Sequence, residues 1–266
     1  MMAYLFKSEH YEQVMNSGDI RWTLPSLVWH LEDLRLGMSY PNYNISRLAS
    51  KFVKVCLSGA GGDELFGGYP WRYYRIFRSL DKNHFLENYF EFWQRLTTPK
   101  ERKELFKDGT DSDDEMFSVF SGVFPEKNDI TFGSPEEQIN ASLYFECRTF
   151  LQGLLLVGDR LSMANGLEER FPFLDNDLVD FAMQLPVSEK LSDLKEMLKI
   201  SEDQVRKKII AQDSFSQGKS CLREAMAHLL PPEIMNAKKQ GFSSPEASWY
   251  RGENAEYVRC LLYTSP

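Results

Sequence analysis

The chain has 266 residues, of which 42% are hydrophobic and 26% are charged, and its formal net charge is −8 at pH 7. These proportions are ordinary for a globular protein of one large or two small domains, long enough to bury a sizeable core. The acidic balance argues against nucleic acid as a partner, because phosphate backbones select basic surfaces.

Cysteine usage and hydropathy indicate a cytoplasmic protein. The four cysteines, Cys56, Cys147, Cys221 and Cys260, are scattered, and no two have the spacing of a metal-ligand pair. The first residues lack the long apolar core of a signal peptide. The most apolar run, 150–157, is far too short to span a bilayer. We therefore expect a reducing, cytoplasmic setting and no membrane partner.

Helical patterns dominate the first 52 residues. A helix is predicted over 22–33 with Thr23 as its N-cap, and a second over 46–52. Residues 12–15 could form a short strand. The first helix is expected to bury one apolar face, made of Leu27, Val28 and Leu31.

The most informative stretch is a strand that runs into a glycine-rich loop. Residues 53–57 (VKVCL) predict a buried parallel strand, and residues 58–69 read SGAGGDELFGGY. Open α/β sheets bind ligands at the carboxyl ends of their strands, and glycines let backbone N–H groups approach an anion. Asp63 and Glu64 would repel a bare phosphate, so they indicate Mg²⁺ between carboxylates and phosphate oxygens. The structural alternative is a glycine turn before an acidic helix start.

The rest of the chain is predicted to be mostly helical. Aromatic residues between 71 and 93 are expected to pack between helices rather than to stack on bases. Capping signals predict helices after Thr98 and Ser134, and another is expected over 219–230. A helix starting at Asp175 is expected to direct three side chains inward, Leu178, Phe181 and Ala182.

Four later motifs follow the glycine-rich loop in order. They are DRLSMANGLEERFPFLD at 159–175, GK and LREA within 218–225, LP at 230–231, and KQGF at 239–242. Together with the loop they resemble the asparagine synthetase family of ATP-dependent amide-forming enzymes, specifically the C-terminal synthetase domain of the glutamine-hydrolysing members. The matches run from about Tyr40 to Trp249.

The resemblance implies a fold and a reaction. The fold is α/β, a partial doubly wound parallel sheet of the adenine nucleotide alpha-hydrolase type, mostly helical in this chain. Residues 1–95 would be an incomplete nucleotide-binding part, and 96–266 a mainly helical part of the same domain. The reaction converts aspartate, ATP and ammonia from glutamine into asparagine, AMP and pyrophosphate.

The resemblance also implies roles for individual residues. The pyrophosphate and nucleotide would be bound by the hydroxyl and backbone groups of the loop, namely Ser58, Gly59, Gly61 and Gly62. Asp63 would take magnesium, and Lys219 would supply positive charge as pyrophosphate leaves. Glu168 would be an orienting or proton-handling carboxylate.

Each of these residues also has a purely structural interpretation. A lysine after glycine is usually a solvated surface residue, and Glu168 and Arg170 could be a structural ion pair that fixes the turn before Pro172. Asp159 and Arg160 could line the site or pair with each other.

The pattern departs from the family in three places. A first ATP loop of the form Ser-Gly-Gly-x-Asp-Ser is absent from the 57 residues before Ser58, and no amidotransferase domain with a leading nucleophilic cysteine is present. Ala60 stands where the family often carries a large polar residue, which leaves the acid substrate open. We therefore expect a fragment of the synthetase domain, with little or no synthetase activity alone. The alternatives are a non-catalytic remnant or interaction subunit, or a related amide- or lactam-forming ligase.

Overall fold

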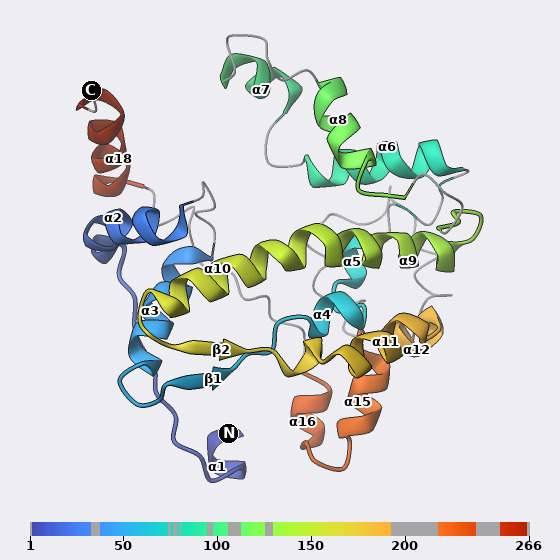
Figure 1. Ribbon diagram of the computed structural model, residues 1–266, viewed down its shortest axis with the longest axis horizontal. Helices are drawn as coiled ribbons and strands as arrows, with labels where there is room; N and C mark the ends of the chain where they lie inside the picture. Colours follow the sequence, from blue (N-terminus) through green and yellow to red (C-terminus); the bar gives the residue numbers. More distant parts are fainter. Residues whose placement is uncertain are drawn as a thin grey trace. The chain divides into compact units, whose positions relative to one another are not determined.

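The computed structural model shows a mostly helical α/β protein with a small two-stranded parallel sheet (Figure 1). It describes residues 2–32, 38–73, 76, 79, 81–94, 98–105, 113–125, 130–192, 218–237 and 251–264. No helix within those ranges is long and apolar enough to cross a membrane.

The chain forms two compact units that interleave along the sequence. The first contains residues 1–58, 153–172 and 240–266, and the second contains 59–152 and 173–239. Each unit is described by itself. The expected boundary between 1–95 and 96–266 stays a prediction.

The first unit combines helices with the strand pair. Its elements are α1 (Met2–Leu5), η1 (Ser17–Asp19), α2 (Ile20–Leu31), α3 (Ser39–Ala49), β1 (Val55–Leu57), α10 (Gln152–Met163, from its second residue), β2 (Glu168–Arg170) and α18 (Glu253–Thr264). Its core joins α2, α3 and α10 through Ile20, Leu27, Leu31, Tyr40, Val157 and Leu161.

Helix α2 differs from its prediction at both ends and on one face. It starts at Ile20, so Thr23 lies inside the helix and donates its hydroxyl to Asp19 O at 3.0 Å. Val28 is exposed. At the other end, Arg160 Nη1 donates to Leu31 O and lies 3.8 Å from Glu32 Oε2. The arginine side chain thus satisfies a carbonyl at the helix C-terminus and lies beside the capping Glu32.

The strand predicted at 53–57 is β1 and is parallel, as expected. Its partner β2, which was not predicted, places Glu168 opposite Val55 and Arg170 opposite Leu57. The predicted burial of this strand is wrong, because Val55 is 52% and Leu57 75% exposed. A parallel strand becomes buried only when other elements cover its faces. The described residues leave these two side chains uncovered. An apolar sequence therefore predicted the strand but not its environment.

The second unit is built from short and medium helices. They are α4 (Gly62–Leu65), α5 (Pro70–Tyr73), α6 (Lys82–Trp93), α7 (Pro99–Leu105), α8 (Asp113–Ser121), α9 (Pro135–Glu146), η2 (Cys147–Leu151), η3 (Pro172–Leu174, from its second residue), α11 (Asn176–Gln184), α12 (Val187–Lys190), α15 (Ser220–Met226) and α16 (Pro232–Met235).

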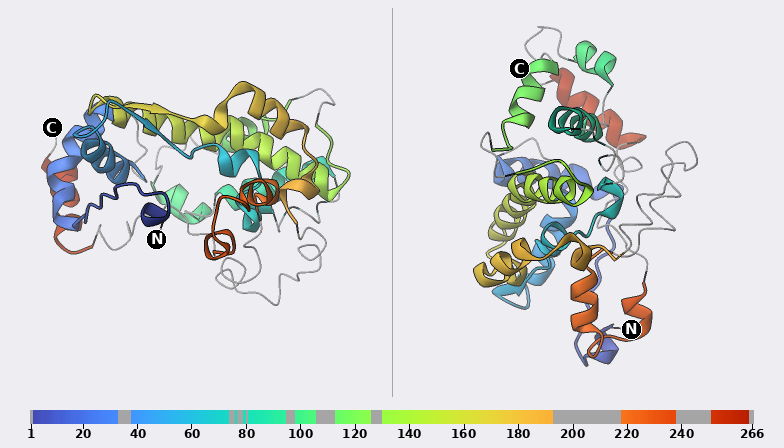
Figure 2. Two further views of the ribbon diagram at one scale, coloured as in Figure 1. Left: turned by 90° about the horizontal axis from the view of Figure 1, so that it is seen from below. Right: turned by 90° about the vertical axis from the view of Figure 1, so that its right-hand side faces the viewer.

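Aromatic side chains form the main core of the second unit. Helix α6 lies beside α9 (Figures 1 and 2), and Phe85, Tyr89, Phe120 and Phe145 are buried between α6, α8 and α9. The ring centroids of Phe120 and Phe145 are 4.8 Å apart, and those of Tyr89 and Phe145 5.3 Å. The prediction that this aromatic run packs between helices is confirmed for its described residues, while Tyr74 and Phe77 lie outside them.

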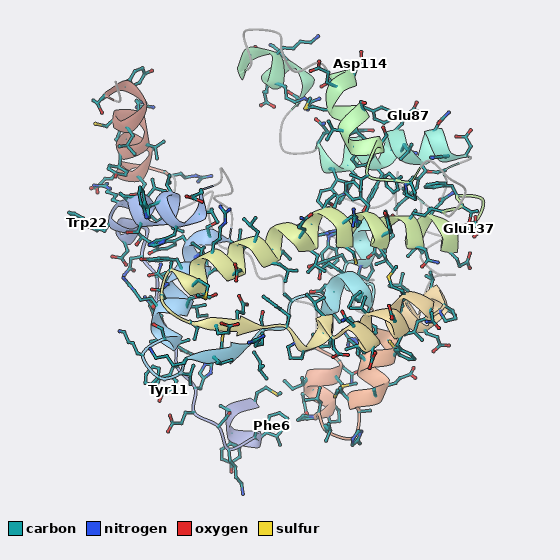
Figure 3. All side chains as sticks on the ribbon, viewed as in Figure 1. Phe6, Tyr11, Trp22, Glu87, Asp114 and Glu137 are labelled. Carbon is teal, nitrogen blue, oxygen red and sulfur yellow. The ribbon has the colours of Figure 1, made fainter. Side chains whose placement is uncertain are left out.

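The predicted helix starts are confirmed where a capping side chain marks them. Ser134 Oγ accepts from Glu137 N at 3.2 Å, and Glu137 Oε2 accepts from Ser134 N at 3.1 Å (Glu137 is labelled at the start of α9 in Figure 3). Thr98 caps α7 in the same reciprocal manner with Glu101, whereas Asp175 Oδ1 accepts from Asp177 N and Leu178 N at the start of α11. Local hydrogen bonds suffice for these starts, so neighbouring residues encode them.

Other boundaries and faces differ from the predictions. Residues 12–15 form no strand, and the helix expected over 46–52 is α3, which ends at Ala49. The helix expected over 219–230 is α15, which ends at Met226. On α11 the prediction for Phe181 is wrong, since it is 56% exposed, whereas Ala182 is fully buried.

Replacing Phe85 by alanine should destabilise the protein strongly. Phe85 is fully buried against Tyr89, Phe124 and Phe132, so its loss removes apolar contacts and leaves a cavity. We expect the free energy of unfolding to fall by about 3–5 kcal/mol in urea denaturation. Val119→Ala, at an exposed position on α8, should change it by less than about 0.5 kcal/mol. Equal effects of the two changes would contradict the assigned core.

Candidate functional site

In the first unit, two candidate residues belong to the strand pair. Ser58 continues the ladder beyond β1 and donates its N–H to Arg170 O at 2.8 Å, while Glu168 N–H donates to Lys54 O at 2.8 Å. Glu168 Oε1 lies 3.1 Å from Arg170 Nη2, with the Arg170 side chain exposed and the Glu168 side chain about half exposed. The ion pair foreseen as the structural alternative is therefore present.

In the second unit, the glycines at the start of α4 allow close packing. Gly61 has φ +92°, and a Cβ there would lie 2.4 Å from Leu174 Cδ2. A Cβ on Gly62 would lie 3.2 Å from the Phe173 ring. Gly61 thus needs glycine for its left-handed turn, and Gly62 packs tightly against the Phe173 ring of η3. This structural need exists whether or not the loop binds an anion.

The segment at Gly218 and Lys219 returns to the end of this loop. Gly218 forms an antiparallel bridge with Leu191, and Lys219 N–H donates to Phe66 O at 3.0 Å. A Cβ on Gly218 would lie 2.3 Å from Gly67 O, so only glycine permits this approach. Lys219 has φ +62°, a left-handed conformation that is uncommon outside glycine and costly for a lysine.

This return places Lys219 against Asp63. Lys219 Nζ lies 2.9 Å from Asp63 Oδ1, and both side chains are partly exposed. The Asp63 carboxylate also lies against Gly68, where a Cβ would be 1.7 Å from Oδ1. The structure thus brings together Gly61, Gly62, Asp63 and Lys219 in one unit, and Ser58 and Glu168 on neighbouring strands in the other.

Asp63 and Glu64 do not act as a pair. The Glu64 side chain is only 1% exposed and accepts a hydrogen bond from Tyr69 Oη at 2.8 Å. Successive helical residues point in different directions, so Asp63 is the carboxylate of this pair that faces Lys219. Groups of three or more His, Cys, Asp or Glu suited to a metal do not occur within the described ranges. One carboxylate does fit Mg²⁺ that arrives with phosphate oxygens.

The sequence did not predict a role for three polar residues that connect to α4, namely Tyr69, Arg72 and Glu146. Tyr69 binds Glu64, and Arg72 and Glu146 form a buried ion pair beside Tyr69, with Nη1 and Oε1 3.3 Å apart. Burial raises the pKa of the Tyr69 hydroxyl, and the Glu64 and Asp63 carboxylates raise it further. The tyrosine therefore stays a neutral donor. Tyr69 stood within the quoted motif, but no local signal connects Arg72 with Glu146.

Comparison with known proteins identifies the family. The sequence model of the asparagine synthase family matches residues 1–266, the whole chain. The chain belongs to this family. It is 28% identical over 284 residues to glutamine-hydrolyzing asparagine synthetase 1 of Bacillus subtilis strain 168, and 26% identical over 273 residues to asparagine synthetase 3 of the same organism. It is also 30% identical over 126 residues to the amidase chyE of Penicillium rubens.

The matched region is a minor part of these relatives. The two Bacillus subtilis alignments cover 97% and 98% of this chain but 41% and 38% of those proteins. The chyE alignment covers 47% of this chain and 16% of that protein. The chain thus spans about two fifths of the length of the synthetases that it matches.

Replacing Gly218 by alanine should disturb the approach of Lys219 to the loop. The added methyl group meets backbone Gly67 O, which cannot move aside as a side chain could. We expect the free energy of unfolding to fall by about 1–3 kcal/mol. Gly18→Ala is the matched control, because a Cβ there meets nothing within 4 Å. A Gly218→Ala protein as stable as this control would refute the close contact.

Proposed function

We propose that this chain carries the synthetase chemistry of an ATP-dependent amide ligase of the asparagine synthetase type. The observation that carries the proposal is the Lys219–Asp63 pair, 2.9 Å apart. Gly218 and Asp63 both lie in segments that resemble family motifs, and a close glycine contact joins the segments. The family match over the whole chain supports the same reaction class.

The proposed reaction has two steps. A carboxylate oxygen of aspartate attacks the α-phosphorus of ATP, and the bond to the bridging oxygen breaks to release pyrophosphate. Ammonia then attacks the acyl carbon of the adenylate, AMP leaves, and the nitrogen loses a proton to give asparagine. The protein must hold the pyrophosphate, balance its charge and exclude water.

Residues of this chain would divide that work. Ser58, Gly59, Gly61 and Gly62 would bind pyrophosphate through hydroxyl and backbone donors. Lys219, already beside Asp63, would stabilise the negative charge that grows on pyrophosphate as it leaves.

Asp63 would hold the magnesium ion that accompanies ATP. When bound, this ion would neutralise charge on the phosphate oxygens. The partly exposed position of the Asp63 carboxylate suits this role, whereas the buried, tyrosine-bound Glu64 does not share it.

Glu168 is proposed to orient the intermediate or to accept a proton. Its side chain is about half exposed and lies beside Arg170, so a ligand can reach it. The two-stranded parallel pairing also supports the finer fold proposal, a partial doubly wound sheet of the adenine nucleotide alpha-hydrolase type. A cytoplasmic location and a glutamine amidotransferase domain as the source of ammonia complete the proposal.

Magnesium pyrophosphate binding to the 266-residue chain tests the proposal. Isothermal titration calorimetry should show binding to the wild-type chain, and Asp63→Asn and Lys219→Met should each weaken it. We expect the Kd to rise about 10- to 100-fold in each variant, the range for losing a contact with a charged group.

Matched surface variants separate a site from general electrostatics. Lys100→Met and Asp114→Asn remove the same charges from exposed positions on α7 and α8 (Asp114 is labelled in Figure 3). These controls should leave the Kd unchanged. No binding by the wild-type chain, or equal losses in controls and site variants, would instead favour a non-catalytic remnant.

A further inference from the structure

The second unit contains a buried ion pair beside Tyr69, the residue that contacts helix α4. Glu146, the last residue of α9, is fully buried, and Arg72 on α5 is 7% exposed. Glu146 Oε1 lies 3.3 Å from Arg72 Nη1 and accepts a hydrogen bond from Tyr89 Oη at 3.3 Å. Charges in such a place are costly to desolvate, and an apolar replacement of similar volume is often as stable. A contribution to folding stability is therefore a weak explanation for the presence of this ion pair.

The guanidinium group connects this pair to the loop. Arg72 Cζ lies 3.7 Å from the centroid of the Tyr69 ring and 4.3 Å from that of Phe150. Cation–π contacts of this kind are strongest where water is excluded. Glu146 thus restrains Arg72, and Arg72 restrains the Tyr69 ring.

Tyr69 in turn reaches helix α4. Its hydroxyl donates to Glu64 Oε1 at 2.8 Å, and Glu64 is the neighbour of Asp63 on this four-residue helix. The Gly68 N–H also donates to Asp63 O at 2.7 Å. Two hydrogen bonds thus connect Tyr69 and its neighbour Gly68 to the short helix that bears Asp63.

We propose that Arg72 and Glu146 are positioning residues that act through Tyr69 and Glu64 to hold Asp63 in its ligand-binding geometry. The inference rests on the proposed function, because it concerns the same magnesium pyrophosphate site. It adds residues outside the family motifs to that site.

The surroundings of Glu146 make its charge depend on pH in the neutral range. Burial raises the pKa of Glu146 to about 7, against the lowering effects of Arg72 and the Tyr89 hydrogen bond. Glu64 on α4 raises it further. Tyr73 on α5 also faces the carboxylate, and the following residue, Cys147, interacts with it electrostatically. Within the described part of the chain, Glu146 Oε2 and Tyr73 Oη have no hydrogen-bond partner. Protonation of Glu146 would weaken the restraint on Arg72.

Two near-isosteric variants test the positioning role. Glu146→Gln mimics the protonated carboxyl, and Tyr69→Phe removes only the hydroxyl that binds Glu64. The Kd for magnesium pyrophosphate is measured by calorimetry at pH 6 and pH 8. Because pyrophosphate itself titrates in this range, the comparison is the ratio of variant to wild-type Kd at each pH.

The two variants should give different pH profiles. For Glu146→Gln the ratio should be near 1 at pH 6, where wild-type Glu146 is mostly protonated, and should rise about 10-fold at pH 8, as for loss of an outer-shell partner. Tyr69→Phe should raise the ratio at both pH values. Ser142→Ala is the buried control, one turn earlier on α9, and should keep the ratio at 1 throughout.

Failure of the inference differs from failure of the function. If Asp63→Asn abolishes binding while Glu146→Gln and Tyr69→Phe follow the wild type at both pH values, the positioning role is wrong and the site stands. If the wild-type chain binds no magnesium pyrophosphate, the proposed function itself is wrong. If Glu146→Gln does not fold, an unchanged Tyr69→Phe ratio still overturns the inference, because Arg72 and Glu146 are proposed to act through the Tyr69 hydroxyl.

Discussion

The contact between Gly218 and the backbone of Gly67 is the constraint on which the candidate site depends. A methyl group at position 218 would lie 2.3 Å from Gly67 O, so the two segments meet only because one residue lacks a Cβ. The contact lets Lys219 bind Phe66 O and bring its Nζ to 2.9 Å from Asp63 Oδ1. A lysine in a left-handed conformation persists here because the surrounding contacts determine it.

The aromatic core strengthens the electrostatic interaction between Arg72 and Glu146. Helices α6, α8 and α9 exclude water around Tyr89 and Phe145, and Glu146 ends α9 at the margin of this core. In such a low-dielectric setting a guanidinium and a carboxylate interact far more strongly than at the surface, and each is costly to leave unpaired. The packing that stabilises the second unit therefore also connects Glu146 with Tyr69.

The strand pair is far less buried than the aromatic core. Its two parallel strands bring Ser58 and Glu168 to one sheet, yet Val55 and Leu57 remain exposed. Parallel strands of this composition are usually covered on both faces. The chain that carries this strand pair belongs to the asparagine synthase family and spans about two fifths of the length of two relatives.

The sequence by itself determined the features that neighbouring residues control. The capping box at Ser134 was predicted because hydrogen bonds within a few residues decide it. The strand expected at 53–57 was predicted from its β-branched, apolar side chains, although β1 spans Val55–Leu57 and its hydrogen-bond partner lies far away in the sequence. The glycine-rich loop was recognised from its motif. Only the tertiary structure decided that Lys219 contacts Asp63 and that Glu64 turns away toward Tyr69. It also decided that Arg72 meets Glu146, and that Leu57 and Phe181 are exposed. Periodicity defines the faces of an element, but burial and ion pairing depend on what packs against those faces.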